Sequence, residues 1–191
     1  MTLKTIFLVL LSFSILAFEA KLERIRGNVT VNGVQAVKGM KLAEGNTIEA
    51  KGKKSLFIVR YSNGAKYMLR NGKLILKEFN INESKINLIS GKLITSIKNK
   101  TYKKDKFIVK TRTASLGVRG TKFWILESPK DTYLCVCEGV VSASNKNYQT
   151  TVKKNEDLHI GLTSKLSTQG ANSKMLDMAL EDFREMGEPV E

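Results

Sequence analysis

The sequence predicts an all-β protein, in which many short strands wrap around a shared core in a β-solenoid-like manner, followed by one amphipathic C-terminal α-helix. Three observations predict this fold. From residue 22 to about 160, short β-branched or apolar runs alternate with Gly and Asn turns at a spacing of about ten residues. No run before residue 172 has helical periodicity. After residue 172, apolar residues recur at the spacing of a helix.

The strands are predicted from the apolar runs and from the turn residues between them. Residues 55–61 are followed by Ser62-Asn63-Gly64, and residues 65–70 are followed by Asn71-Gly72. An Asn-Gly pair between two such runs predicts a hairpin, because both turn residues must accept a positive φ. Gly91 separates two more runs in the same way. The remaining runs are at 73–77, 86–90, 92–97, 106–112, 122–127, 132–137, 140–144 and 148–153.

Alternation along a strand assigns its side chains to two faces. Leu74 and Leu76 point to one side, whereas Lys73, Ile75 and Lys77 point to the other. Strands with one apolar and one mixed face pack their apolar faces together. The sequence therefore predicts a single core enclosed by the strands.

A helix is predicted at about 174–186. Asn172 or Ser173 can cap its N-terminus by accepting a hydrogen bond from a free backbone N–H. Gly187 favours a left-handed C-terminal stop, and Pro189 prevents continuation. We expect the helix to dock on the β-domain with its acidic face toward basic strands; binding of a partner or a second copy is the alternative. Its apolar stripe is Leu176, Ala179, Leu180, Phe183 and Met186.

The N-terminus has the layout of a secretory signal peptide. Lys4 precedes a twelve-residue apolar run at 6–17, and small residues follow at Ala17 and Ala20. The run is too short to span a bilayer, which needs roughly 20 apolar residues. We expect cleavage after Ala17 or Ala20, with a retained anchor as the alternative. The predicted division is a signal peptide at 1–20, a β-domain at 21–160, and a linker with the helix at 161–191. Export by this signal would place the protein in the periplasm or outside the cell. No further membrane span is expected.

The charge of the chain is uneven. The formal net charge is +14, but residues 172–191 carry −4 and residues 21–171 therefore carry +18. A basic surface favours anionic partners. For an exported protein these would be cell-wall polymer, lipopolysaccharide or an acidic protein, and nucleic acid is not expected. The alternative is that the lysines occupy solvent-facing strand positions and protect sheet edges.

Few residues suggest catalysis. The chain has one histidine, His159, and lacks a nucleophile elbow, a P-loop, a dinucleotide fingerprint and a His-Glu metal motif. Glu127 and Glu138 could still converge from distant strands. We therefore expect a protein that is not an enzyme and has no cofactor or metal.

The two cysteines form the sequence Cys135-Val136-Cys137. In a strand their side chains share a face, with α-carbons about 6.5–7 Å apart. That separation is at the outer limit of disulfide geometry, so a direct bond would need local distortion. Zinc-binding pairs usually have two to four intervening residues. We expect two small apolar strand residues, with a strained or intermolecular redox bridge as the alternative.

The most specific string lies at 117–123, GVRGTKF. Its two glycines permit positive φ or close backbone approach, which predicts a tight bend that enters a strand. Arg119 lies between the glycines, and the Glu138-Gly139 pair is a natural internal partner for its guanidinium. A phosphate-binding loop is disfavoured, because no helix follows to supply an N-terminal dipole. The candidate partner-binding residues are Gly117, Val118, Arg119, Gly120, Thr121, Phe123, Trp124, Glu138 and Gly139.

This string resembles the signature GVRGTxF of the FecR family. Residues 136–141, VCEGVV, are similar to the closing Val-x-Glu-Gly-x-Val of that family. Weaker similarities precede the signature in the family's order, so that the resemblance covers roughly residues 22–160. They lie at 42–48, 55–64, 91–93 and 107–111.

The resemblance implies a periplasmic or surface β-domain that works by binding. The best-known FecR proteins span the inner membrane and relay a signal from an outer-membrane transporter to a cytoplasmic sigma factor. This chain is more similar to stand-alone exported FecR-domain proteins, which implies a protein-interaction, scaffolding or signal-transduction module. Binding of an anionic envelope polymer is the alternative.

The register of the family makes a second prediction. It implies that Cys135 and Cys137 face outward, beneath the C-terminal helix. The core-facing residues of the same region would be Leu134, Val136, Val141 and Ala143.

Overall fold

The computed structural model describes residues 18–80, 83–98 and 107–190, without the side chains of Phe79 and Arg119. Most of the predicted signal peptide, residues 1–17, lies outside this part of the chain. Twelve strands of one sheet and one helix make up the described fold. In chain order they are β1 (Ala20–Val31), β2 (Val34–Gln35), β3 (Lys41–Leu42), β4 (Thr47–Tyr61), β5 (Lys66–Phe79), β6 (Ser84–Ser96), β7 (Phe107–Lys110), β8 (Ser115–Glu127), β9 (Thr132–Ser144), β10 (Gln149–Lys153), β11 (Glu156–Ile160), β12 (Gln169–Gly170) and α1 (Ser173–Met186).

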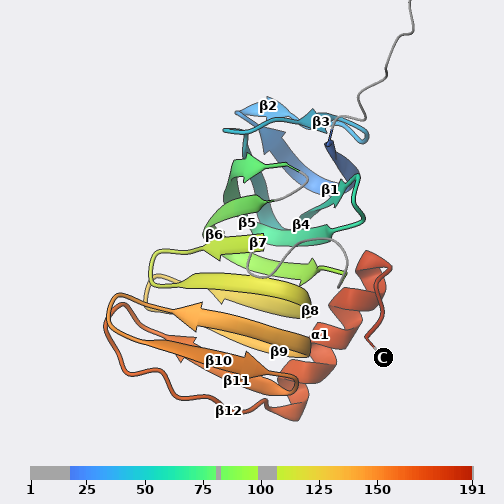
Figure 1. Cartoon of the computed structure of the whole chain (residues 1–191). Coiled ribbons are helices and arrows are strands. Elements are labelled where there is room, and N and C mark those ends of the chain that lie inside the picture. Colours follow the sequence, from blue (N-terminus) through green and yellow to red (C-terminus); the bar gives the residue numbers. More distant parts are fainter. Residues whose placement is uncertain (1–17, 81–82, 99–106, 191) are drawn as a thin grey trace, which may run out of the picture.

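The sheet is largely an antiparallel meander. Its order is β12-β11-β9-β8-β7-β6-β5-β4-β1-β2, with β3 paired to β1, β10 paired to β9, and an additional β6–β8 pairing. The strands lie one below another from β1 to β11, and α1 runs along one side of them (Figure 1). The prediction of an all-β fold with one C-terminal helix is confirmed. The arrangement differs from a β-solenoid, in which neighbouring coils pair in parallel, because β6–β7 is the only parallel pair among the described strands.

The long strands are bent near their middle. Gly27, Gly52, Gly91, Gly120 and Gly139 all have positive φ, and each coincides with a shift in strand register. An extra residue in one strand of a pair bends the strand locally. Because these bulges lie in adjacent strands, they form one crease across the sheet.

The crease folds the sheet over its own core. In β4, Ile48 and Ala50 precede the crease and Phe57 and Val59 follow it, yet all four lie in the same apolar cluster. The two halves of each long strand therefore pack against each other. This fold-over gives the wrapped core that the alternation predicted.

The crease also explains where turn prediction was wrong. Ser62-Asn63-Gly64 does join two strands, because β4 ends at Tyr61 and β5 begins at Lys66. In contrast, Asn71-Gly72 lies inside β5 and Gly91 lies inside β6. An Asn-Gly pair tolerates positive φ in a bulge as well as in a hairpin turn. Several of the short runs predicted as separate strands are thus the two halves of one long strand.

A second apolar cluster forms outside the folded sheet. In the second half of β4, Phe57 and Val59 face the main core, whereas Leu56 and Ile58 face α1. Both faces of this half-strand are consequently buried. The predicted single core is therefore accompanied by a second, smaller cluster, which α1 completes.

Helix α1 begins and ends as its caps predict. The Asn172 side chain accepts a hydrogen bond from the Lys174 backbone N–H at 2.9 Å, and Gly187 adopts a left-handed φ of 73°. The buried apolar side chains of α1 are Ala179, Phe183 and Met186, while Leu176 and Leu180 are half-buried. The apolar stripe therefore faces the sheet.

The acidic side chains of α1 meet basic strands, as expected. Asp182 accepts a hydrogen bond from Arg70 Nε at 2.8 Å and also contacts Lys92. Glu185 contacts Arg70 and lies 3.0 Å from Arg26 Nη1. Asp182 is buried, so its desolvation must be compensated by these two cations. The contacts fix where along the sheet the helix sits.

Candidate functional site

The candidate residues 117–123 lie in β8 at the crease. Gly120 has φ 56° and Gly139 of β9 has φ 82°. A β-carbon added to Gly139 would lie only 2.4 Å from the Gly120 carbonyl oxygen. The Thr121 hydroxyl donates a hydrogen bond to the Val140 carbonyl at 2.9 Å. These residues allow two backbones to approach closely where both strands bend.

The side chains of the string are divided between the two clusters. Val118 and Phe123 are buried in the main core, whereas Trp124 is buried beneath α1. The side chain of Arg119 lies outside the described part of the structure, so its predicted pairing with Glu138 stays a prediction. Glu138 instead contacts Lys122, with 2.8 Å between the ammonium and the carboxylate.

A half-open hollow of about 370 Å³ lies beside the crease. We call it the crease hollow. Its charged side chains are two lysines and two glutamates, so its surface is polar and of mixed charge. The residues that line it are Ser96, Ile97, Lys98, Gly120, Thr121, Lys122, Glu138, Glu188 and Pro189.

The C-terminal tail forms one wall of the crease hollow. Lys122 Nζ donates to the Pro189 carbonyl at 2.7 Å, and the Ser96 hydroxyl donates to Glu188 at 3.3 Å. Lys66, with 3% of its side chain exposed, donates to the Met186 carbonyl at 3.1 Å and lies 3.5 Å from Glu188. A buried lysine thus fastens the end of the helix to the sheet.

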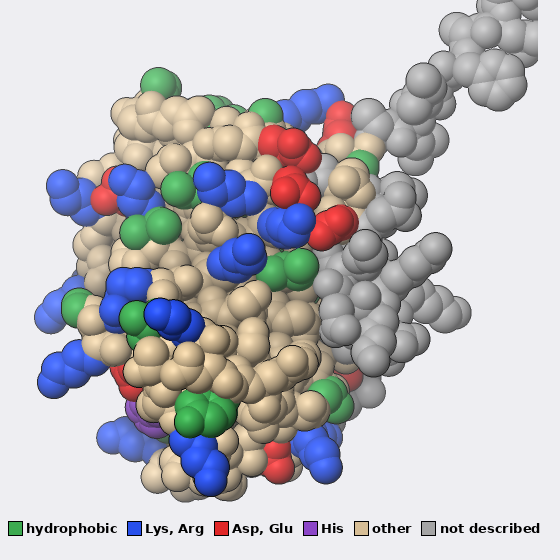
Figure 2. All heavy atoms as spheres, turned by 60° about the vertical axis from the view of Figure 1, so that its left-hand side comes forward, with side chains coloured by type: hydrophobic (Ala, Val, Ile, Leu, Met, Phe, Trp, Pro, Cys, Tyr) green, Lys and Arg blue, Asp and Glu red, His purple; other side chains and the backbone are tan. Residues whose placement is uncertain are grey.

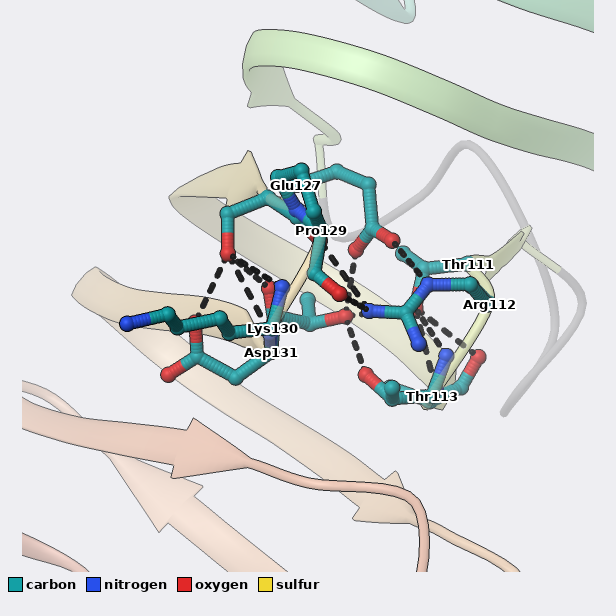
Figure 3. A network of polar contacts seen from close by, with 10 residues as sticks. Thr111, Arg112, Thr113, Glu127, Pro129, Lys130 and Asp131 are labelled. Carbon is teal, nitrogen blue, oxygen red and sulfur yellow. Dashed lines mark hydrogen bonds and ion pairs between the residues drawn. The ribbon is translucent and has the colours of Figure 1, made fainter.

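Glu127, a carboxylate considered for catalysis, belongs to a polar network (Figure 3). Its side chain is only 2% exposed, and it accepts a hydrogen bond of 2.6 Å from the Thr132 hydroxyl. Thr132 in turn contacts the hydroxyls of Thr111 and Thr113 at 2.6 and 2.7 Å. Burial raises the pKa of Glu127, while Thr132 and Arg112 oppose the rise. The network joins the β7–β8 and β8–β9 turns, which is a structural role.

His159 pairs with a different carboxylate. Its Nδ1 lies 2.6 Å from Asp131 Oδ2, and its own side chain is 62% exposed. The hydrogen bond with His159 lowers the pKa of Asp131, although burial opposes this.

Glu127 pairs with Thr132 at the start of β9, whereas Glu138 lies farther along that strand opposite Lys122. The structure therefore does not bring these two glutamates together.

Cys135 and Cys137 are both buried and unbonded, on the face of β9 that α1 covers. The hydrogen bond from Cys137 lowers the pKa of Cys135 against the effect of burial, and Trp124 and Tyr133 add to the lowering. The same contact and burial raise the pKa of Cys137. The orientation implied by the family register is confirmed. The four core-facing residues are Leu134, Val136, Val141 and Ala143.

The basic side chains do not gather into one patch on the face drawn in Figure 2. Lysines and arginines are spread over it, with single apolar side chains between them. Within residues 18–80, 83–98 and 107–190, no group of three or more metal-ligating side chains was found. In that same part of the chain, no helix has the length and apolarity needed to cross a bilayer.

The fold and the site define a class: an all-β domain, creased along glycines, with one docked helix. Residues 52–142 match the model of the family described as FecR protein. These residues, from the bulge in β4 to the second half of β9, therefore belong to the FecR family and form a FecR domain. No curated protein matches the chain in sequence.

The solved structures that are similar to the chain include a pair from one organism. Both are described as a "putative anti-sigma factor" from Parabacteroides distasonis ATCC 8503. The first has a TM-score of 0.56 and 17% identity, and the match covers 69% of this chain and 62% of that one. The second has a TM-score of 0.48 and 14% identity, with 73% of each chain covered. The chain thus spans about three fifths of the first structure, and the likeness concerns the fold.

Sequence reasoning missed the cations that hold the C-terminal segment. Lys66, Arg70 and Lys92 come from β5 and β6 and meet only when these strands pair. No local motif joins them. In the sequence, the only indication of these contacts was the charge contrast between the basic domain and the acidic C-terminus.

Proposed function

We propose that this chain is a non-enzymatic regulatory module of the bacterial envelope that acts by binding another protein. The match of residues 52–142 to the FecR family supports a role in signal transduction, and it is the observation that carries the proposal. The signature residues also favour binding over catalysis, since they shape a crease and a core.

The proposed contact surface is the crease hollow. It is open to solvent and lies beside the signature. Its lysines and glutamates suit the polar rim of a protein interface, where paired charges give orientation and specificity. We further propose that residues 1–20 direct export, which would place this surface in the periplasm or outside the cell.

Binding of an anionic polymer is a weaker proposal, and no comparison supports it. The two functions differ in their response to salt. Contacts between exposed charges weaken as ionic strength rises, whereas a protein interface with an apolar centre keeps much of its affinity.

Site-specific photo-crosslinking in intact cells tests the proposal. Lys98, which lines the crease hollow, is replaced by a photoreactive phenylalanine; the control replaces the exposed Lys146 in the β9–β10 turn. We expect a discrete protein adduct at position 98 and none at position 146. Equal labelling at both positions, or adducts to polymer alone, would count against a protein partner at this surface.

A further inference from the structure

Several polar and sulfur-bearing side chains gather beneath α1. Tyr133, Cys135 and Cys137 alternate along β9 and therefore share one face of the strand. Trp124 of β8 is the direct cross-strand neighbour of Cys135, and Asp157 of β11 is its neighbour on the other side. Cys135 is thus surrounded on its own sheet face.

One buried polar atom of this group has no hydrogen-bond partner among the described residues. It is Oδ1 of Asp157, a residue that is 3% exposed. The other carboxylate oxygen of Asp157 accepts a hydrogen bond from the Tyr133 hydroxyl at 2.7 Å. Unpartnered buried polar atoms are uncommon in folded proteins and call for an explanation.

One of the two thiols, that of Cys137, borders a hollow at the surface. A half-open hollow of about 260 Å³ lies between α1 and the β10–β11 turn, and Cys137 forms part of its wall. Its other lining residues are Lys154, Asn155, Leu176, Leu180 and Val190. An ion or small molecule would meet Cys137 before Cys135.

We propose that Cys135 and Cys137 together bind one monovalent copper ion through their two sulfur atoms. Thiolates are soft ligands that select monovalent copper. A structural zinc site needs four ligands, and no group of three metal-ligating side chains was found in the described part of the chain. A monovalent ion with a filled d shell accepts two ligands in a line. Neither the thiol pair nor the hollow beside it depends on the proposed regulatory function.

Two thiolates and one monovalent copper ion carry a net negative charge, which a nearby cation must offset. The Asp157 carboxyl group beside Cys135 accepts a hydrogen bond from the Tyr133 hydroxyl. Lys92, whose ammonium lies 4.6 Å from the centre of the Trp124 ring, offsets part of the negative charge that two thiolates would add. On binding, each thiol releases its proton to solvent and forms one sulfur–copper bond. The ion stays monovalent, and no oxidant or reductant is consumed.

The single tryptophan of the chain makes this site directly observable. The reduced full chain, without its leader, is titrated anaerobically with monovalent copper in competition with a colorimetric chelator. Silver(I) serves as a second probe, because it changes its oxidation state less readily than copper does. We expect a 1:1 complex and a change in Trp124 fluorescence that saturates at one equivalent.

Variants at the two thiols decide the assignment. Cys135→Ala and Cys137→Ala should each weaken binding at least 100-fold while leaving the circular dichroism spectrum unchanged. Met178→Ala, which changes an exposed sulfur on the outer side of α1, is the matched control and should bind like the wild type. Wild-type affinity in either cysteine variant, a fluorescence response to zinc equal to that to copper, or a Cys135–Cys137 disulfide in protein isolated from cells would overturn the proposal.

Discussion

Replacing Gly139 by alanine tests whether the crease depends on its glycines. Gly139 has φ 82°, a region in which a β-carbon costs roughly 1–2 kcal/mol. The new β-carbon would also lie 2.4 Å from the Gly120 carbonyl oxygen, which is backbone and cannot rotate away. Relief of that overlap requires a backbone shift, which typically costs about 1–3 kcal/mol. The expected loss in free energy of unfolding is therefore about 2–5 kcal/mol.

Gly39 provides the matched control for this change. It has nearly the same φ, 85°, but a β-carbon there would meet no heavy atom within 4 Å. Gly39→Ala should lose only the conformational part, roughly 1–2 kcal/mol. The free energy of unfolding of each variant is measured by denaturant titration and extrapolated to water. Equal losses for the two variants would refute the close approach of β8 and β9 as the reason for glycine at position 139.

Three further changes have outcomes that the structure specifies. Phe183→Ala removes a fully buried side chain of α1 and should reduce the free energy of unfolding by about 3–5 kcal/mol; Met178→Ala on the exposed side of α1 should change it by less than about 0.5 kcal/mol. Burial raises the pKa of Glu127 above its usual value of 4.5. Above pH 4.5 the native state therefore binds more protons than the unfolded state, and the free energy of unfolding falls as the pH rises. Glu127→Gln should flatten that fall when unfolding is measured from pH 4 to 7. If the leader is removed, N-terminal sequencing should find Phe18 first rather than Lys21, since Phe18 stacks on Tyr61 at 5.5 Å and a later cut would remove it.

The alternation of side chains correctly predicted an all-β fold and the faces of the strands, but not the antiparallel arrangement that replaces the expected solenoid. Leu74 and Leu76 are buried in the main core, as their spacing required. The crease was not predicted, because positive φ at Asn71 and Gly91 is equally compatible with a turn and with a bulge. Only the neighbouring strand decides between them, and that pairing is not local in sequence.

The candidate site was predicted in part for the same reason. The string at 117–123 could be recognised, but the residues that complete the crease hollow come from β6 and the C-terminal tail. The orientation of Cys135 followed from family register and strand alternation. Its neighbour Asp157 could not be found, since it lies 22 positions away along the chain and meets Cys135 only through the β9–β11 pairing.

The charge contrast within the chain is explained in part by an internal interface. Asp182, Glu185 and Glu188 recur every three residues, and they contact Arg70, Lys92, Arg26 and Lys66 on the sheet. Buried ion pairs add little net stability, because desolvation offsets their attraction, but they disfavour any placement that leaves a charge unpaired. The apolar stripe of α1 therefore supplies most of the docking energy, and the acids select one position for it. Since these cations are already paired, the net charge of +18 overstates the positive surface available to an external anionic polymer, and this weakens the polymer hypothesis relative to a protein partner.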